Sequence, residues 1–180
     1  MLALCSPANV EADRKNMAGI LNTWKAKQGT EKPLLVVINT SGGGHRSATF
    51  TMAVLQELDS LSKGALMKKT FLINGASGGM IGAAYFRELY LRKMKGENIN
   101  LQNKQYIDDI AGDLLNPVFT SFFARDLIAP AQKFNVGPYR YVKDRGYAFE
   151  QKLNSNTRGF LNKQLRDYVA DEKAANAPLI

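Results

Sequence analysis

Two glycine-rich segments carry the residues of this chain that are best suited to chemistry. The first contains the consecutive glycines Gly42, Gly43 and Gly44, and the second is the segment 75–79, Gly-Ala-Ser-Gly-Gly. The second segment fits the GxSxG pattern, in which a serine on a tight strand-to-helix turn acts as a nucleophile. The first has the form of a loop whose free backbone amides converge on an oxygen anion. Together the two segments predict a serine acyl hydrolase.

Ser77 is the candidate nucleophile of this site. A serine on such a turn needs small neighbours, because the strand before it and the helix after it pass close together. The residues on either side of Ser77 are glycines and an alanine. The amide of Gly78 would join the glycine run in an oxyanion hole, where one donor contributes about 3 to 4 kcal/mol in known enzymes. The alternative is a flexible turn without catalytic function, since the five-residue pattern also occurs by chance.

Hydrophobic patterns predict the elements that position these two turns. The residues 34–39 and 70–73 form short apolar runs typical of strands buried in a parallel sheet. The residues 46–61 and 80–94 repeat apolar side chains at helical spacing. Each glycine-rich turn therefore links a strand to a helix. A right-handed βαβ crossover would place both turns at the carboxyl ends of neighbouring strands, facing one site. The fold class that follows is α/β.

The rest of the chain is predicted to be largely helical. A surface helix is expected at 9–27, and further helices at 106–115, 118–128, 145–154 and 158–169. We expect Pro117 to separate the second and third of these, and Gly137-Pro138 to form a turn. The final residues 178–180 resemble the start of a new strand, so we expect the sequence to be cut there. The 180 residues are expected to form one domain, or a large part of one.

Composition narrows the classes of partner. Lysine and arginine outnumber acidic residues 24 to 16, for a net charge of +8, which favours anionic surfaces such as lipid headgroups. The basic residues are scattered and form no strip with aromatic residues, so we predict no nucleic-acid binding. No apolar run approaches the length of a membrane span, and the first seven residues are too short for a secretory signal. With Cys5 as the single cysteine, no internal disulfide can form. These features favour a cytoplasmic protein or one in peripheral contact with an anionic membrane.

Nucleotide binding is the main alternative function for the first glycine segment. A P-loop needs a Gly-Lys-Ser or Gly-Lys-Thr sequence, which does not follow here. The dinucleotide pattern GxGxxG also fails, because Gly42, Gly43 and Gly44 are consecutive. We therefore favour an oxyanion loop.

His45 is the only histidine, and it precedes the candidate nucleophile Ser77. A triad in the chain order serine, acid, histidine is therefore excluded within these residues. A histidine in the oxyanion loop should also lie on the wrong side of the serine hydroxyl. We favour a carboxylate as the direct proton acceptor of Ser77, with His45 as the alternative base.

Arg46 lies at the start of a predicted helix, where the helix dipole disfavours positive charge. Such a position suggests that Arg46 binds a phosphate group. A salt bridge to Glu57, Asp59 or another acidic residue is the alternative.

The paired motifs, Ser-Gly-Gly-Gly-His-Arg-Ser at 41–47 and Gly-Ala-Ser-Gly-Gly at 75–79, resemble the patatin-like phospholipases, which share their core with the cytosolic phospholipases A2. The stretch 144–150, Asp-Arg-Gly-Tyr-Ala-Phe-Glu, is similar to one found downstream of the serine in that family. The resemblance covers about the span 34–150. It implies a three-layer α/β/α fold with a mostly parallel sheet, and hydrolysis of acyl esters in lipids by a serine–aspartate dyad. It implies no histidine base, no metal and no cofactor.

The resemblance also implies a role for each matching residue. Ser77 would be the nucleophile, the amides of the glycine run and of Gly78 the oxyanion hole, and Arg46 a site for the headgroup phosphate of a phospholipid or another acyl-ester lipid. The family's aspartate lies in an Asp-Gly-Gly or Asp-Gly-Ala motif, and no aspartate here precedes a glycine. We therefore expect the catalytic aspartate to lie outside this sequence, and the 180 residues to be inactive on their own. An acyltransferase on the same site, or a lipid- or anion-binding domain without catalysis, are the alternatives.

Overall fold

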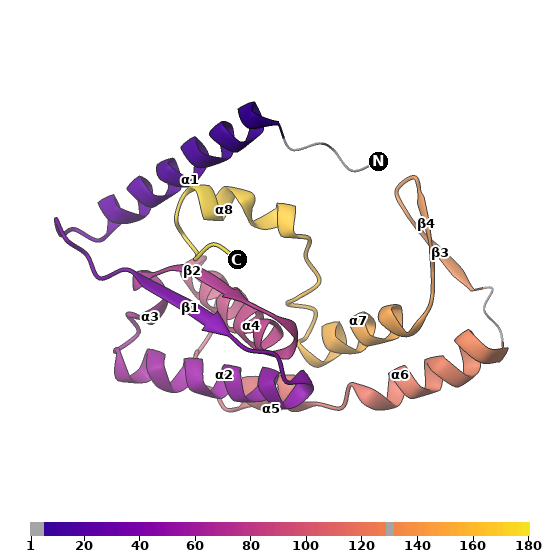
Figure 1. Ribbon diagram of the computed structural model, residues 1–180. Coiled ribbons are helices and arrows are strands. Elements are labelled where there is room, and N and C mark those ends of the chain that lie inside the picture. Colours follow the sequence, from indigo (N-terminus) through magenta and orange to yellow (C-terminus); the bar gives the residue numbers. More distant parts are fainter. Residues whose placement is uncertain (1–5, 129–131) are drawn as a thin grey trace.

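The computed structural model describes residues 6–128 and 132–180, so Cys5 lies outside the described residues. The elements follow one another as drawn in Figure 1. They are α1 (Pro7–Lys27), β1 (Val36–Thr40), α2 (Gly44–Leu61), α3 (Leu66–Lys69), β2 (Thr70–Gly75), α4 (Ser77–Met94), α5 (Gln105–Ala111), α6 (Leu115–Ser121), the π-helical turn η1 (Phe122–Ile128), β3 (Lys133–Val136), β4 (Tyr139–Val142), α7 (Arg145–Asn156), the 3-10 turn η2 (Leu165–Tyr168) and α8 (Val169–Lys173). The described residues form a mixed α/β fold, as the sequence predicted.

The two strands that precede the glycine-rich turns, β1 and β2, form a small parallel sheet. Their register ends with Thr40 paired to Gly75. The other edge of β2 binds Leu179, whose carbonyl accepts a hydrogen bond from the Ile73 amide over 2.8 Å. This contact is a single parallel bridge, and it confirms the strand-like character expected at the end of the sequence. Strand β2 therefore lies between β1 and this bridge.

Helices α2 and α4 pack closely against each other below and behind the sheet (Figure 1). A Cβ atom at Gly78 would overlap the carbonyl oxygen of Gly44, and one at Gly82 would overlap that of Ala48. The two helix backbones are thus in direct contact, which only glycine permits. Both helices begin earlier than their apolar periodicity predicted, because the glycines and the serine at their starts carry no hydrophobic signal. The contact buries a core that includes Met52, Leu55, Ala83, Tyr85, Phe86 and Leu89.

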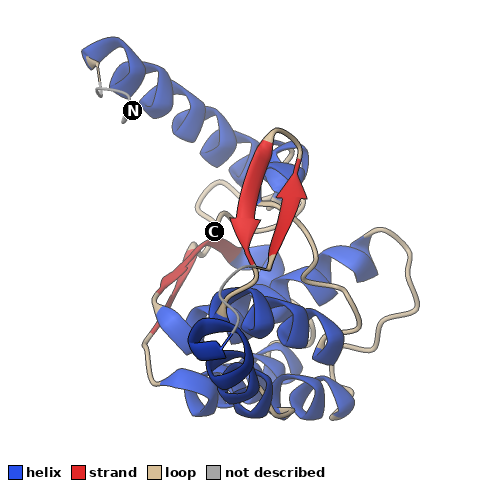
Figure 2. Cartoon of the chain, turned by 90° about the vertical axis from the view of Figure 1, so that its right-hand side faces the viewer, coloured by secondary structure: helices blue, strands red, loops and turns tan. Residues whose placement is uncertain are grey.

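The first helix, α1, matches the surface helix expected from the sequence. Ser6 caps its start by accepting a hydrogen bond from the Asn9 amide over 3.2 Å. Figure 2 shows that α1 extends away from the body of the molecule, and Trp24 is its buried residue. The Trp24 ring meets Phe71 of β2 edge-on, with 6.0 Å between ring centroids. No helix in the described ranges is both long and apolar enough to cross a membrane.

The boundaries predicted for the helices at 106–115 and 118–128 were wrong. Helix α5 ends at Ala111, and α6 begins at Leu115. Pro117 therefore lies in the first turn of α6, where its missing amide would have no partner within the helix. Helix α6 then passes directly into η1.

Helix α7 is confirmed, but the helix predicted at 158–169 was wrong. Arg158 and Gly159 have φ angles of 58° and 75°, in the left-handed region that ends a helix. The Gly159 amide binds the Asn154 carbonyl over 2.6 Å, which closes α7. Helical structure returns only in the short elements η2 and α8. Phe160, expected as a core contact, does pack against the hydrophobic core.

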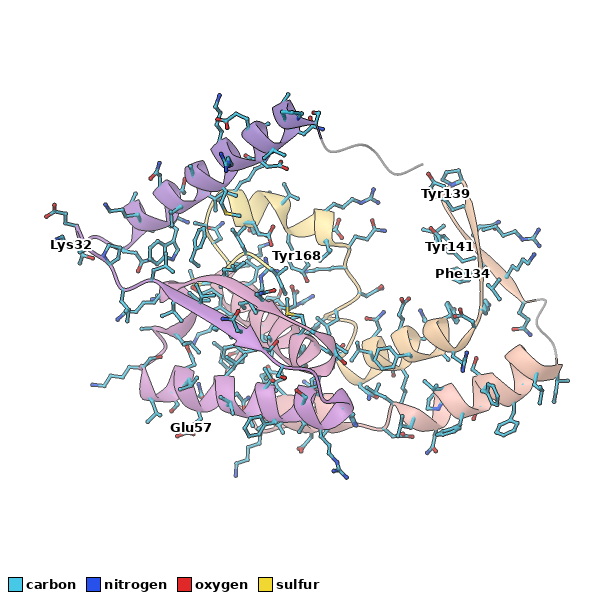
Figure 3. The ribbon with its side chains drawn as sticks, viewed as in Figure 1. Lys32, Glu57, Phe134, Tyr139, Tyr141 and Tyr168 are labelled. Atoms are coloured by element: carbon cyan, nitrogen blue, oxygen red, sulfur yellow. The ribbon has the colours of Figure 1, made fainter. Side chains whose placement is uncertain are left out.

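The turn expected at Gly137-Pro138 is confirmed as the connection of a hairpin, β3–β4, that the sequence analysis did not predict. Phe134 pairs with Tyr141 across the hairpin, and their ring centroids are 5.6 Å apart. Figure 3 shows these labelled aromatic residues together on one side of the hairpin. The strands have four residues each, too few for the pattern to be read from the sequence.

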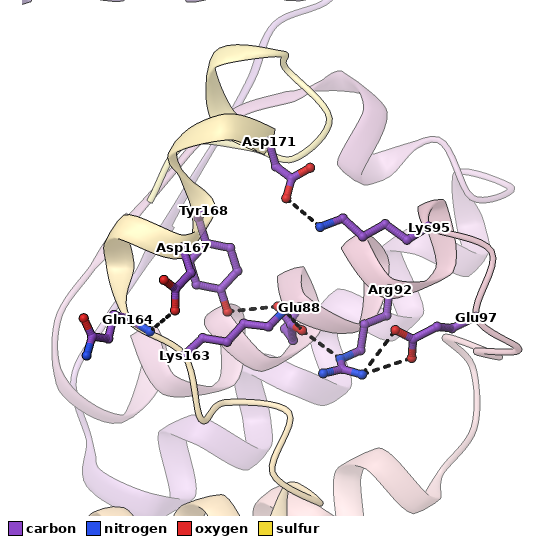
Figure 4. A network of polar contacts seen from close by, with 9 residues as sticks. All are labelled: Glu88, Arg92, Lys95, Glu97, Lys163, Gln164, Asp167, Tyr168 and Asp171. Carbon is purple, nitrogen blue, oxygen red and sulfur yellow. Dashed lines mark hydrogen bonds and ion pairs between the residues drawn. The ribbon is translucent and has the colours of Figure 1, made fainter.

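A buried carboxylate joins the end of the chain to α4. Glu88 is fully buried and accepts hydrogen bonds from the Tyr168 hydroxyl (2.9 Å), the Lys163 ammonium (2.5 Å) and the Arg92 guanidinium (2.7 Å). Figure 4 shows these side chains converging on Glu88 from two parts of the chain. The network holds the segment that contains η2 against the helix that begins at Ser77.

Candidate active site

The two glycine-rich turns lie side by side at one edge of the sheet. Because Thr40 pairs with Gly75 at the end of the ladder, Gly42 and Ser77 each lie two residues beyond the last paired position. A Cβ atom added to Gly42 would be 3.5 Å from the Cβ of Ser77. The structure therefore brings the candidate nucleophile and the candidate oxyanion loop into contact, as the predicted crossover requires.

The backbone at Ser77 is strained in the way that a nucleophile turn requires. Ser77 has a φ of 54°, which residues other than glycine rarely adopt, and it is exposed to solvent. It is also the first residue of α4. A Cβ atom at Gly75 would overlap the Thr40 hydroxyl, and one at Gly79 would overlap the Ser41 carbonyl. The small neighbours of Ser77 are therefore required by packing, as expected from the sequence.

Unpaired backbone amides surround this turn. Within the described residues, the amides of Gly42, Gly43 and Gly44 make no backbone hydrogen bond, and no side chain caps the start of α2. The start of α4, which includes Gly78, also lacks a side-chain cap. Both helix N-termini thus leave donors free at the same edge of the sheet. The Ser47 hydroxyl fixes the loop by donating to the Ser41 carbonyl over 2.7 Å.

An apolar pocket of about 230 Å³ opens beside Ser77. Ile110 and Leu114, which line it, are buried at 1% and 4% exposure, whereas Leu115 is 59% exposed. The pocket therefore has a closed floor and an open side. Its lining comes from Gly44, His45, Ala48, Ser77, Gly78, Ile81, Ile110, Leu114, Leu115, Phe149 and Leu153. Among the described residues, none with a carboxylate side chain belongs to this lining.

The walls contributed by α5 to α7 were not assigned to the site from the sequence. Phe149 and Leu153 were expected only as core contacts, and Ile110 and Leu114 were part of a predicted helix. Each pair has the spacing of neighbours on one helix face, which is the only signal in the sequence that could have suggested a shared wall.

His45 is held by the backbone. Its Nε2 atom lies 2.7 Å from the Ile110 carbonyl oxygen, so Nε2 carries the proton and donates to that oxygen. This bond ties α2 to the end of α5 and leaves Nδ1 as the only ring nitrogen able to accept a proton. Within the described residues no hydrogen bond joins His45 to Ser77, so His45 stays the alternative base and not an observed partner.

Two aspartates next to elements that line the pocket, Asp113 and Asp144, bind backbone amides. Asp113 accepts hydrogen bonds from the Leu115 and Asn116 amides, and these bonds lower the pKa of its carboxyl group. Asp144 caps α7 by accepting from the Tyr147 amide over 3.0 Å. Within the described ranges, no hydrogen bond joins Ser77 to a carboxylate. The aspartate that the family resemblance implies as proton acceptor is thus not found in contact with Ser77.

Arg46 is exposed and has no ion pair or hydrogen bond with any residue of the described ranges. The alternative salt bridge to Glu57 or Asp59 does not form. Asp59 is instead buried and bound by the Gln102 side chain over 3.3 Å. The guanidinium of Arg46 is therefore available to a ligand.

Within the part of the chain that is described, no three metal-binding side chains of histidine, cysteine, aspartate or glutamate lie together. Comparison of the chain with models of protein families, with curated proteins and with solved structures finds no match. The chemical interpretation of the site therefore depends on its own geometry.

Proposed function

We propose that this protein is a serine acyl hydrolase that cleaves acyl esters of lipids, a phospholipase or lipase of the patatin-like type. The observation that carries the proposal is the position of Ser77. It is an exposed serine with a φ of 54°, two residues after the end of β2, in contact with an uncapped glycine loop and at the edge of an apolar pocket. Strained backbone of this kind is concentrated at active sites.

In the proposed reaction, the Ser77 oxygen attacks the ester carbonyl while a carboxylate accepts its proton. The carbonyl oxygen becomes an anion, which the amides of Gly42, Gly43, Gly44 and Gly78 stabilise. Collapse of this intermediate breaks the bond to the alcohol, which leaves with the proton. Water then attacks the acyl-serine by the same steps in reverse order, releasing a carboxylic acid and restoring the serine.

We propose that the carboxylate is an aspartate from sequence beyond these residues, as the family resemblance implies. The three-layer α/β/α arrangement is part of the same proposal, and the parallel pairing of β1 with β2 supports it. Arg46 would bind the headgroup phosphate, because its guanidinium has no partner and phosphate accepts paired hydrogen bonds from arginine. The excess of positive charge would favour peripheral contact of a cytoplasmic protein with an anionic membrane.

A lipid-binding domain without catalysis is the second candidate. It is favoured by one observation, that no carboxylate within the described residues contacts Ser77. It predicts that the pocket and Arg46 bind lipid but that Ser77 does not react.

A fluorophosphonate probe tests the proposal, because it reacts only with activated serines. In the full-length natural protein, it should label Ser77, and the label should be lost in Ser77→Ala. Ser60→Ala, which removes an exposed serine at the far end of α2, should keep it. Equal labelling of the protein and of Ser77→Ala would exclude the hydrolase, and no labelling of either would favour the binding domain.

A further inference from the structure

The pocket beside Ser77 has room for only part of a long acyl chain. An apolar cavity of about 150 Å³ holds the six carbons of benzene, so each carbon needs about 25 Å³. On this scale the pocket of about 230 Å³ accommodates roughly nine carbons. A membrane phospholipid with chains of about twice this length would leave much of each chain outside.

The chemistry of the lining fits a hydrocarbon chain. Seven of the lining residues are aliphatic or aromatic, namely Ala48, Ile81, Ile110, Leu114, Leu115, Phe149 and Leu153. The one ring with polar atoms, His45, already donates to the Ile110 carbonyl. Beyond Ser77, the glycine amides and His45 Nδ1, a polar headgroup would meet only apolar side chains, whereas an acyl chain would leave water without losing a hydrogen bond.

The floor of the pocket is closed by the core. Ile110 belongs to the main hydrophobic cluster, together with Tyr106 and Leu101. Leu114 is 4% exposed. Because protein cores are close-packed, a longer chain could enter further only by displacing these side chains.

We propose that this pocket binds the acyl chain of the substrate and limits it to about eight or nine carbons, so that medium-chain esters are favoured over long-chain esters. The proposal rests on the proposed function, because it takes Ser77 as the point where the ester lies. It goes further by stating which acyl esters the site selects.

Binding of alkyl carboxylates tests the length limit without requiring catalysis. The probes are the saturated carboxylates from butanoate to tetradecanoate, below their micelle concentrations, titrated calorimetrically into Ser77→Ala. Each added methylene should lower the Kd about fourfold up to eight or nine carbons, and further methylenes should change it little. A steady decrease through tetradecanoate, or no binding of any carboxylate, would overturn the proposal.

A variant of the floor provides the matched test. Leu114→Ala removes three carbons from the floor, so the plateau should move to about three carbons longer. Leu101→Ala removes the same atoms from a core residue at 3% exposure outside the pocket lining, and it should leave the plateau in place. An equal movement of the plateau in both variants would mean that general loosening of the core, and not the floor, sets the length.

Hydrolysis of p-nitrophenyl esters of the same lengths by the full-length natural protein separates the two proposals. Activity that peaks at about eight carbons supports both. Carboxylate binding with a plateau but no hydrolysis keeps the length limit and excludes the hydrolase. Hydrolysis that rises steadily to long chains keeps the hydrolase and overturns the length limit.

Discussion

Gly43 and Ser47 are in such close contact that a Cβ atom at Gly43 would lie 3.0 Å from the Cβ of Ser47. Gly43 also has a φ of 144°, which an L side chain rarely adopts. Because Ser47 fixes the loop through the Ser41 carbonyl, a side chain at Gly43 has to displace the loop itself. The orientation of the free amides beside Ser77 therefore depends on the absence of a side chain at one position.

Gly43→Ala should lower the kcat of ester hydrolysis about 100-fold with little change in KM, because losing one oxyanion donor has an effect of this size. The measurement is steady-state hydrolysis of p-nitrophenyl octanoate by the full-length natural protein. Gly64→Ala is the matched control, since Gly64 has a φ of 78° but lies in open space away from the site. Both variants should lose stability, but only the first should lose activity per folded molecule. Equal kcat values would show that the amides of this loop do not act in the reaction.

Arg46→Gln should lower phospholipid cleavage about tenfold, since a hydrogen bond to a charged group contributes about 1.5 kcal/mol or more. Cleavage of an uncharged ester with the same acyl chain should be unchanged. Arg14→Gln removes another exposed positive charge, on α1, and serves as the control for general attraction to an anionic surface. A similar loss in both variants would mean that net charge, and not a phosphate site, explains the effect.

The sequence predicted the part of the site that depends on local patterns. The apolar runs before each turn, the glycines and the helical periodicity after them together predicted where Ser77 and the run 42–44 lie. These features are local because a strand, a tight turn and a helix N-terminus each have their own residue preferences. The expectation that both turns face one site followed from the parallel pairing and right-handed crossover of the two strands.

The rest of the site depends on contacts between distant segments. The pocket floor is formed by Ile110 of α5 and by Leu114, which lies between α5 and α6, and the contact of α5 with α2 includes the His45–Ile110 hydrogen bond, which no pattern in the sequence encodes. The helix predicted at 158–169 failed because left-handed residues at its start override its apolar spacing. Periodicity detects which face of an element is apolar, but it does not detect what that face contacts.

Gly82→Ala should destabilise the protein by about 2 to 3 kcal/mol, because the added Cβ atom overlaps the Ala48 carbonyl oxygen and forces α2 and α4 apart. The measurement is the free energy of unfolding in urea. Gly19→Ala is the control, since a Cβ atom at this position of α1 meets no neighbouring atom. It should stabilise the protein by about 0.5 to 1 kcal/mol, as expected for alanine in a helix. A Gly82→Ala variant as stable as the unsubstituted protein would contradict the close contact of the two helices.

Glu88→Gln should destabilise the protein by about 2 to 3 kcal/mol. The buried carboxylate binds Lys163 and Arg92, and its loss leaves two cations without their shared partner. This loss is smaller than the one expected for a fully buried ion pair, because both cations are partly exposed. Glu97→Gln removes a 45% exposed partner of Arg92 and should change the free energy of unfolding by less than about 1 kcal/mol. Similar losses of unfolding free energy in the two variants would show that the burial of Glu88 does not increase its contribution to stability.

Asp59→Asn should remove a pH dependence of stability. Burial raises the pKa of the Asp59 carboxyl group above its ordinary value of 3.8, and its Oδ1 atom is buried without a hydrogen bond. The Asp59 carboxyl group therefore ionises at a lower pH in the unfolded protein than in the folded protein. Since the folded state then binds more protons, the free energy of unfolding should fall as the pH rises from 3.8 through the raised pKa of the folded state.

The measurement for Asp59 is urea unfolding of the protein and of Asp59→Asn at pH values from 3.5 to 7, in steps of about half a unit. The stability of the variant relative to the unsubstituted protein should increase over this range, because the variant has no carboxyl group to ionise. A difference between Asp59→Asn and the protein that stays constant with pH would mean that the carboxyl group ionises equally in both states.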